Sequence, residues 1–287
     1  MQLQDILYSQ GFGIRRVCSG LVQQGWVEVY EDGADQPVRV TDSTAEYEPE
    51  GLRFRVQGVD WEYHEKGYAL LYKPAGTECS QKPSAYPSIY TLLPAPLRQR
   101  PNKGAVQGLQ AVGRLDQDTT GLLLLSDDGQ FIHRMSSPKK HVAKVYRVTT
   151  KHPVTQAMVD KLLAGVVLDD DPKPVKAAAC EMVSECVLDL TLTEGKYHQV
   201  KRMIAAVSNR VEGLHRWKIG GLQLPADMKP GEWRWLSAEE LALLETLDTG
   251  KPIRHSLRDD IPGAARAIRW YAEEIDKVYG EVATTSS

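Results

Sequence analysis

Asp116 occupies a place in the sequence that suits a reactive carboxylate. It lies in the stretch "AVGRLDQDTTGLLLLSDDG" at residues 111–129, two positions after Arg114 and shortly before the run Leu122 to Leu125. Four consecutive leucines between turn residues are typical of a strand buried on both faces. A carboxylate in the loop before such a strand can act as a nucleophile or base, and Arg114 can pair with it and keep it ionised. Asp is also common in glycine-bounded turns, so this stretch alone is equally compatible with a turn former.

Part of the same stretch matches a calcium-binding loop. The segment "DQDTTGLLLLSD" has acids at its first, third and twelfth positions and glycine at its sixth. The flanks do not fit, because "NKGAVQGLQAV" upstream is too rich in glycine for a long helix and a leucine stands at the ninth position. The four cysteines, Cys18, Cys79, Cys180 and Cys186, show neither CxxC nor Cys/His spacing. We therefore expect no metal site and no disulfide framework.

Three further stretches carry side chains that could act with this carboxylate. "YKPAG" places Lys73 before a tight turn, and "KVYRV" places Tyr146 in a strand. "GKYHQVKRMIAAV" places His198, Lys201 and Arg202 at the start of a helix. Each stretch also has an ordinary interpretation, as the end of a strand, a core tyrosine or surface cations.

The charge is distributed unevenly along the chain. The formal net charge of −3 argues against a uniformly basic nucleic-acid-binding protein. Residues 131–152, however, contain six Lys or Arg and no Asp or Glu, and residues 195–218 contain six Lys or Arg against the single Glu212. These two basic segments predict one positive face.

The pattern of elements predicts an α+β fold with a mainly antiparallel, mixed sheet, since strands and helices alternate without a repeating βα rhythm. Apolar alternation predicts a first unit at residues 1–60, with two helices and the strand "WVEVY", and a main domain at residues 61–245. Residues 246–287 form a C-terminal extension in which residues 264–280 have the apolar stripe of an amphipathic helix. Strands are expected at 68–76, 122–125, 144–150, 187–193 and 221–224, and helices at 89–93, 155–165, 198–207 and 237–245.

Targeting signals are not evident in the sequence. No run of eighteen apolar residues is present, and "MQLQDILYSQ" lacks the basic segment and apolar core of a secretory signal. We expect a cytoplasmic protein with reduced thiols, no contact with a membrane, and a monomeric state.

Taken together, the motifs resemble those of bacterial pseudouridine synthases of the RsuA type, which modify small-subunit ribosomal RNA. The resemblance extends from residue 1 to about residue 245. It rests on "YKPAG", "GRLDQDTTGLLLLSDDG", "KVYRV" and "EGKYHQVKRMIAAV…LHRWKIGGLQL".

The resemblance implies a pseudouridine synthase domain, isomerisation of a uridine in ribosomal RNA, and no cofactor. It assigns the essential catalytic aspartate to Asp116, the tyrosine that packs on the target uracil to Tyr146, and the basic partner of the aspartate to Lys201. The expected substrate-binding residues are Arg114, Lys73, His198 and Arg202 in the main domain and Arg15 and Arg16 in the first unit. Whether the aspartate attacks the ribose anomeric carbon, attacks carbon 6 of the base or abstracts a ribose proton is left open.

Two features bear on the substrate. Relatives that modify the large subunit tend to have arginines in place of His198 and Lys201, so "YHQVKRM" favours the small subunit. The first unit resembles an RNA-binding module of a ribosomal small-subunit protein, but residues 1–60 contain five Lys or Arg against ten Asp or Glu. Because phosphate binding requires cations, we expect its contribution to be confined to Arg15 and Arg16.

Three other functions are compatible with parts of the sequence. They are a pseudouridine synthase that acts on the large subunit, a non-catalytic RNA-binding assembly protein, and a nucleosidase or glycosidase. The last would need a second acid near Asp116, for which Asp127 and Asp128 are the candidates.

Overall fold

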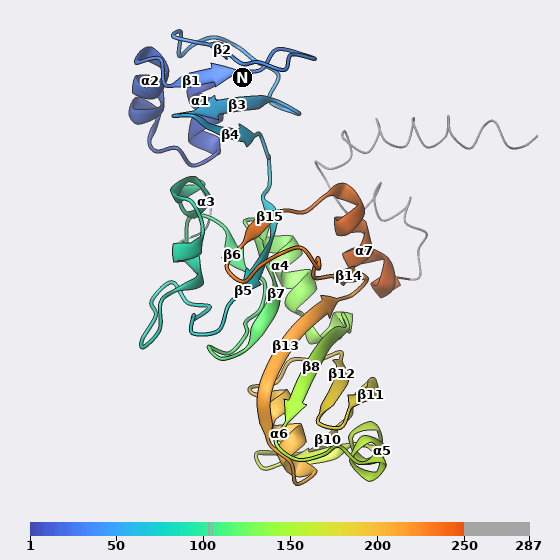
Figure 1. The fold of residues 1–287 in the computed structure, drawn as a ribbon. Helices are drawn as coiled ribbons and strands as arrows, with labels where there is room; N and C mark the ends of the chain where they lie inside the picture. Colours follow the sequence, from blue (N-terminus) through green and yellow to red (C-terminus); the bar gives the residue numbers. More distant parts are fainter. Residues whose placement is uncertain (103, 105, 250–287) are drawn as a thin grey trace, which may run out of the picture.

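The computed structural model describes residues 1–102, 104 and 106–249, which form helices and mainly antiparallel strands (Figure 1). This confirms the α+β class and the mainly antiparallel sheet. No helix within these ranges is long and apolar enough to cross a membrane. The predicted helix at residues 264–280 lies outside the described residues.

The first unit packs two short helices on a four-stranded antiparallel sheet with the order β2-β1-β3-β4. Leu3 and Leu7 lie one turn apart on one helix, and Cys18 and Val22 lie one turn apart on the other, so each helix turns one apolar face to the sheet. Phe54 lies in the same core. The elements are α1 (Leu3–Ser9), α2 (Arg15–Gln23), β1 (Val27–Val29), β2 (Val38–Arg39), β3 (Arg53–Val56) and β4 (Val59–Glu62).

A nine-stranded sheet lies at the centre of the larger part of the molecule, with the order β11-β12-β8-β13-β7-β5-β15, while β14 pairs with β13 and β6 with β7. Every neighbouring pair is antiparallel except β7 and β13, which are parallel near the centre of the sheet. The strands are β5 (Tyr68–Lys73), β6 (Gln110–Ala111), β7 (Thr120–Ser126), β8 (Lys144–Thr150), β11 (Ala179–Ser184), β12 (Val187–Leu192), β13 (Val211–Ile219), β14 (Leu222–Gln223) and β15 (Trp233–Trp235).

The four leucines of β7 explain why this strand is central. Leu122 and Leu124 lie in the core on one face of the sheet, and Leu123 and Leu125 lie in the core on the other face. Side chains alternate between the faces of a strand, so a continuous apolar run fills both cores. The prediction of a strand buried on both faces is confirmed.

Helices cover both faces and the far end of the sheet (Figure 1). The helices predicted at 155–165, 198–207 and 237–245 are confirmed, and residues 89–92 form a 3₁₀ turn. The helix α4 and the small sheet of β9 and β10 were not predicted. The elements are α3 (Ala95–Gln99), α4 (Gly129–Ser136), α5 (Gln156–Ala164), β9 (Val166–Leu168), β10 (Asp171–Val175), α6 (Gln199–Ala206) and α7 (Ala238–Thr249).

Arg100 joins the first unit to the larger sheet. Its side chain is only 2% exposed. Its Nε donates to Asp127 at 2.7 Å, Nη1 donates to the side chain of Gln10 at 2.8 Å, and Nη2 donates to the carbonyl of His64 at 2.7 Å. Trp61 packs against the cores of both parts. The two parts are therefore connected by a buried, hydrogen-bonded charge and by apolar packing.

Candidate active site

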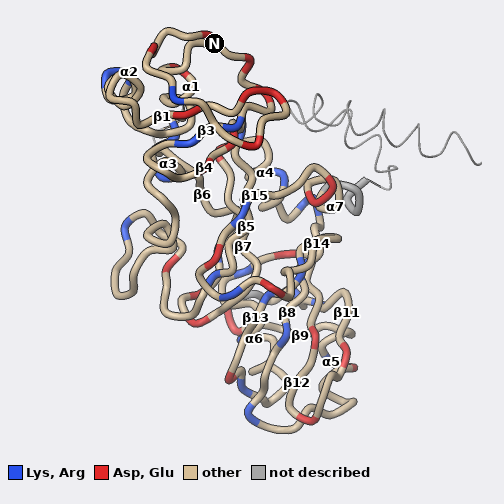
Figure 2. The backbone as a smooth tube through the Cα atoms, turned by 45° about the horizontal axis from the view of Figure 1, so that its top comes forward, with Lys and Arg blue, Asp and Glu red and all other residues tan. Residues whose placement is uncertain are grey.

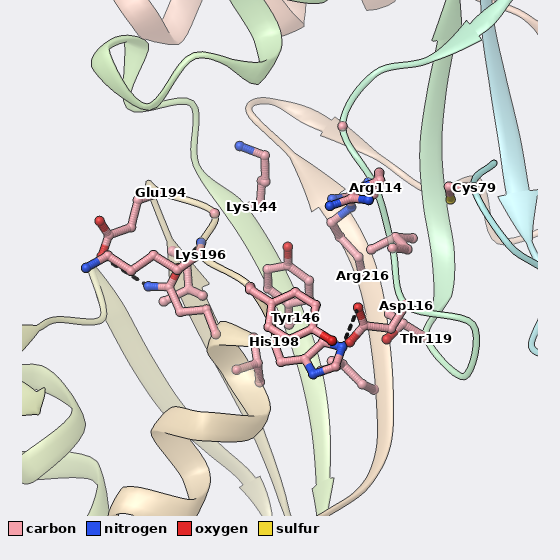
Figure 3. A pocket seen from close by; sticks show the side chains of 18 of the residues that line it. Cys79, Arg114, Asp116, Thr119, Lys144, Tyr146, Glu194, Lys196, His198 and Arg216 are labelled. Atoms are coloured by element: carbon pink, nitrogen blue, oxygen red, sulfur yellow. Dashed lines mark hydrogen bonds and ion pairs between the residues drawn. The ribbon is translucent and has the colours of Figure 1, made fainter. Parts of the chain in front are cut away.

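A cavity of about 650 Å³ lies where the loop before β7, strands β8 and β13 and the start of α6 come together (Figure 3). Of the residues predicted to be catalytic, Asp116, Tyr146 and Lys201 all line it. Arg114 and His198 line it as well. Residues that are far apart in the sequence are thus gathered around one opening.

Lys73 fixes the loop that carries Asp116 through hydrogen bonds to its backbone. The ammonium of Lys73 donates to the carbonyls of Pro74 at 3.1 Å, Gln117 at 3.3 Å and Thr119 at 2.9 Å. The amide of Gly76 donates to the carbonyl of Gln117 at 2.8 Å. These bonds hold the backbone that directly follows Asp116, so the carboxylate has a defined position.

This arrangement corrects the prediction that Lys73 binds substrate. The side chain is 0% exposed, and the residue does not line the cavity. Burial lowers the pKa of its ammonium. Because its donors are turned to backbone carbonyls, Lys73 is a structural support of the aspartate loop.

Two basic side chains flank the carboxylate of Asp116. Lys201 Nζ lies 3.2 Å from Oδ2, and His198 Nε2 lies 3.4 Å from Oδ1. The sequence pointed to Arg114 as the cation that pairs with the aspartate. The structure places Lys201 there instead, in agreement with the role that the resemblance implied.

Lys201 is shared between two carboxylates. Its ammonium also donates to Asp118, at 2.7 and 2.9 Å. Burial alone would lower the pKa of Lys201, but the hydrogen bonds to Asp118 and Asp116 outweigh burial, and the pKa is raised. Burial alone would raise the pKa of Asp118, but the hydrogen bond and the charge of Lys201 outweigh burial, and the pKa of Asp118 is lowered. Both side chains are therefore charged at neutral pH, and Asp118 fixes the ammonium beside Asp116.

Tyr146 forms one side of the cavity from strand β8. Its cross-strand neighbour on β13 is Arg216, whose guanidinium lies 6.0 Å from the centre of the tyrosine ring. Directly opposite residues in neighbouring strands have side chains on the same face. Arg216 and Tyr146 therefore lie next to each other in the cavity, near Asp116 (Figure 3).

The start of α6 presents His198 and Tyr197 to the cavity. His198 has φ of 49° in the left-handed region, which turns the chain sharply into the helix. Its ring stacks on Tyr197 with centroids 3.8 Å apart, and Tyr197 is 71% exposed. The turn is closed by the amide of Lys196, which donates to Gln199 at 2.8 Å. An exposed aromatic surface thus adjoins the carboxylate of Asp116.

The other predicted binding residues lie elsewhere. Arg202 follows Lys201 on α6, but its guanidinium pairs with Asp170 and donates to the carbonyl of Tyr197, and the residue does not line the cavity. Arg15 and Arg16 are exposed on α2 of the first unit, where Arg15 pairs with Asp5 at 2.8 Å.

Sequence reasoning missed four residues of the cavity. Lys144 and Tyr197 were quoted within motifs without a role, and Arg216 lay inside "LHRWKIGGLQL" without being singled out. Cys79 also lines the cavity. The period of two along β8 was the available signal for Lys144, because it stands two residues before Tyr146 and shares its face of the sheet. No group of three or more His, Cys, Asp or Glu side chains in the described ranges is placed to hold a metal ion.

Comparisons with known proteins agree with this geometry. The family model described as RNA pseudouridylate synthase matches residues 67–206. Ribosomal small subunit pseudouridine synthase A of Pasteurella multocida is 46% identical over 175 residues, which cover 61% of this chain and 72% of that protein. The chain belongs to the pseudouridine synthase family. The protein of the same name from Escherichia coli K12 is 43% identical over 179 residues, 62% of this chain and 74% of that protein.

Structural comparison supports the same pseudouridine synthase assignment. A crystal structure described as pseudouridylate synthase is 34% identical with a TM-score of 0.57, and the match covers 85% of this chain and 99% of that one. A second family model, for aldehyde dehydrogenases, matches residues 236–287. That match is confined to the C-terminal end, mostly beyond the described residues, and includes none of the cavity.

Proposed function

We propose that this pseudouridine synthase isomerises a uridine of small-subunit ribosomal RNA. The observation that carries the proposal is Asp116 paired with Lys201 at 3.2 Å in a cavity that Tyr146 lines. The names of the relatives from Pasteurella multocida and Escherichia coli supply the class of RNA. We propose Asp116, Tyr146 and Lys201 as the residues that carry the chemistry.

The reaction that this site would perform is a rearrangement within one nucleotide. The bond between N1 of uracil and C1′ of ribose breaks, the base turns, and a bond forms between C5 and C1′. The proton of C5 leaves to solvent and N1 gains a proton, so atoms and charge balance without an oxidant or a second substrate. Asp116 would act on the ribose or on the base, while Lys201 and His198 hold its two oxygens in place.

Tyr146 would receive the uracil after it leaves the RNA stack. Extruding a base costs on the order of a few kcal/mol. Stacking on an aromatic ring contributes roughly 1–3 kcal/mol per base. The ring of Tyr146 lies beside the aspartate loop and is therefore placed to offset much of the extrusion penalty.

The division of the chain fits this activity. We propose that residues 1–60 form a module that assists RNA binding, that residues 61–245 form the catalytic domain, and that residues 246–287 form a C-terminal extension. Ribosomal RNA is a cytoplasmic substrate in bacteria, and we propose that the protein acts there as a monomer.

The test is release of tritium from RNA labelled at carbon 5 of uracil. The purified protein is incubated separately with unmodified small-subunit RNA, with a precursor of the small subunit, and with large-subunit RNA. We expect one tritium per molecule from a small-subunit substrate and none from the large subunit. Release from large-subunit RNA alone would assign the enzyme to that subunit, and no release from any substrate would favour the RNA-binding assembly protein.

A further inference from the structure

Three cations line the cavity on the side away from Lys201, and we call them the cationic wall: Arg114, Lys144 and Arg216. No carboxylate of the described residues forms an ion pair with any of them. Figure 3 shows Arg114, Lys144 and Arg216 beyond the tyrosine ring, on the side opposite His198.

Four cations of the two basic segments form ion pairs with neighbouring acids. Figure 2 shows acidic residues interspersed with basic ones along the larger sheet. Lys201 pairs with Asp116 and Asp118, and the other paired cations have one acid each. These pairs are Arg147 with Asp189, Arg202 with Asp170 and Arg210 with Glu212. Lys144 and Arg216 come from the same segments and line the cavity, where no acid of residues 1–102, 104 and 106–249 pairs with them.

The remaining acids of the cavity are engaged elsewhere. Glu78 accepts bonds from the backbone amides of Ser84, Ala85 and Tyr86. Glu194 accepts a bond of 3.1 Å from Gln199. Neither forms an ion pair with the cationic wall, so the acids of the described ranges supply no counter-charge there.

Arg216 is the deepest member of the wall, with 2% of the residue exposed. Its Nε donates to the carbonyl of Leu122 at 2.9 Å, and its Nη2 is buried without a hydrogen-bond partner. A buried guanidinium with an unsatisfied donor is unfavourable unless an anion binds it. Its planar fork of N–H groups matches the oxygens of a carboxylate or phosphate.

Lys144 and Arg114 complete the wall from two other elements. Lys144 donates to the carbonyl of Val142 at 3.2 Å, which leaves two of its three donors without a partner in the described chain. Burial and the charge of Arg216 lower the pKa of Lys144 to about 8. Arg114, in the loop before β7, lines the same cavity.

We infer that the cationic wall binds one phosphodiester group of the RNA backbone next to the target nucleotide. This inference rests on the proposed function, which brings an RNA strand into the cavity. At neutral pH the bases of RNA carry no charge, so the phosphate is the anion that an RNA can offer. A nucleotide whose base lies on Tyr146 and whose ribose lies at Asp116 has its phosphates within the same cavity.

The test pairs a protein variant with a chemical change in the RNA. A small-subunit fragment containing the modified uridine is made with a single neutral methylphosphonate at each nearby phosphate in turn. Wild type, Lys144→Met and the control Lys151→Met are compared by kcat and KM. Lys151 is exposed at the other end of β8, so the control removes the same charge outside the cavity.

We expect one methylphosphonate position to raise KM of wild type and of Lys151→Met by roughly tenfold, because a charge-assisted bond is lost. Lys144→Met raises KM by a similar factor on unmodified RNA and is insensitive to methylphosphonate at that same position. RNA binding by Lys144→Met also depends less on salt. The slope of the logarithm of the binding constant against the logarithm of the salt concentration becomes smaller in magnitude by about 0.7.

Two outcomes would overturn the inference while leaving the proposed function in place. One is that all three proteins respond alike to every methylphosphonate. The other is that Lys144→Met lowers kcat at unchanged KM, which would assign the wall to charge that develops on the uracil. Absence of pseudouridine formation by wild type on unmodified RNA would instead contradict the proposed function.

Discussion

The buried charge of Lys144 predicts that the protein has a lower free energy of unfolding than it would have without that charge. Burial and the neighbouring Arg216 lower the pKa of Lys144 from its ordinary value of 10.5 to about 8. The folded protein therefore binds a proton at this site more weakly than the unfolded chain does. This difference lowers the free energy of unfolding at pH values below 8, and the reduction becomes smaller as the pH rises toward 10.5.

The size of the penalty follows from linkage. At pH 7, a lysine whose pKa falls by this amount on folding lowers the free energy of unfolding by about 3 kcal/mol. At pH 10 the same relation gives a reduction of less than about 1 kcal/mol in the free energy of unfolding. Methionine keeps the length and volume of the lysine stem without the ammonium. Lys144→Met should therefore stabilise the protein at pH 7 by up to about 3 kcal/mol, and by much less at pH 10.

The assay is urea unfolding of wild type and Lys144→Met at pH 7, 8.5 and 10. The difference between the two proteins at each pH cancels the other titrating groups. Lys151→Met serves as the control, since its ammonium is exposed, and should change stability by less than about 0.5 kcal/mol at every pH. A Lys144→Met variant that is less stable than wild type at pH 7, or equally more stable at pH 7 and pH 10, would refute the reasoning.

Three further predictions concern the frame of the site. A Cβ on Gly121 would lie 2.1 Å from the carbonyl oxygen of Arg216, at φ of +112°, so Gly121→Ala should lower the free energy of unfolding by at least about 2 kcal/mol. Gly129→Ala, whose Cβ would meet no atom within 4 Å, should not destabilise the protein in the same urea titration. Lys201→Met should lower kcat by at least about tenfold in the tritium assay, whereas Arg202→Met on the next residue of α6 should change kcat by less than about threefold. Arg100→Met, which leaves Asp127 buried without its partner at 2.7 Å, should destabilise the protein by about 3–5 kcal/mol, and the exposed Arg98→Met by less than about 0.5 kcal/mol. Equal effects within any of these three matched pairs would contradict the corresponding contact.

The sequence allowed prediction of those parts of the site that local patterns encode. The four leucines of β7 specify a strand buried on both faces, and the loop before it holds Asp116. The resemblance supplied Tyr146 and Lys201, and the structure brings both to the cavity that Asp116 lines. Arg216 escaped prediction because the pairing of β13 with β7 and with β8 brings it there, and no local pattern reports which strands are neighbours.

Two predicted binding residues were misplaced for reasons that are physical. Lys73 does end a strand, but its side chain lies beneath the aspartate loop, where three carbonyls take its donors. Arg202 follows Lys201 directly, and successive residues of a helix point about 100° apart. Lys201 lines the cavity, whereas Arg202 points in a different direction and pairs with Asp170.

The most direct test of the central claim compares Asp116→Asn, Asp118→Asn and wild type for pseudouridine formation and for RNA affinity. The two substitutions remove the same charge, two residues apart on one loop, and both carboxylates bind the same Lys201. The account predicts that Asp116→Asn lowers turnover by at least about a thousandfold, with RNA affinity within about twofold of wild type. Asp118→Asn should retain measurable turnover. Turnover by Asp116→Asn comparable to that of wild type, or loss of RNA binding to match the loss of turnover, would contradict the assignment of Asp116 as the catalytic carboxylate.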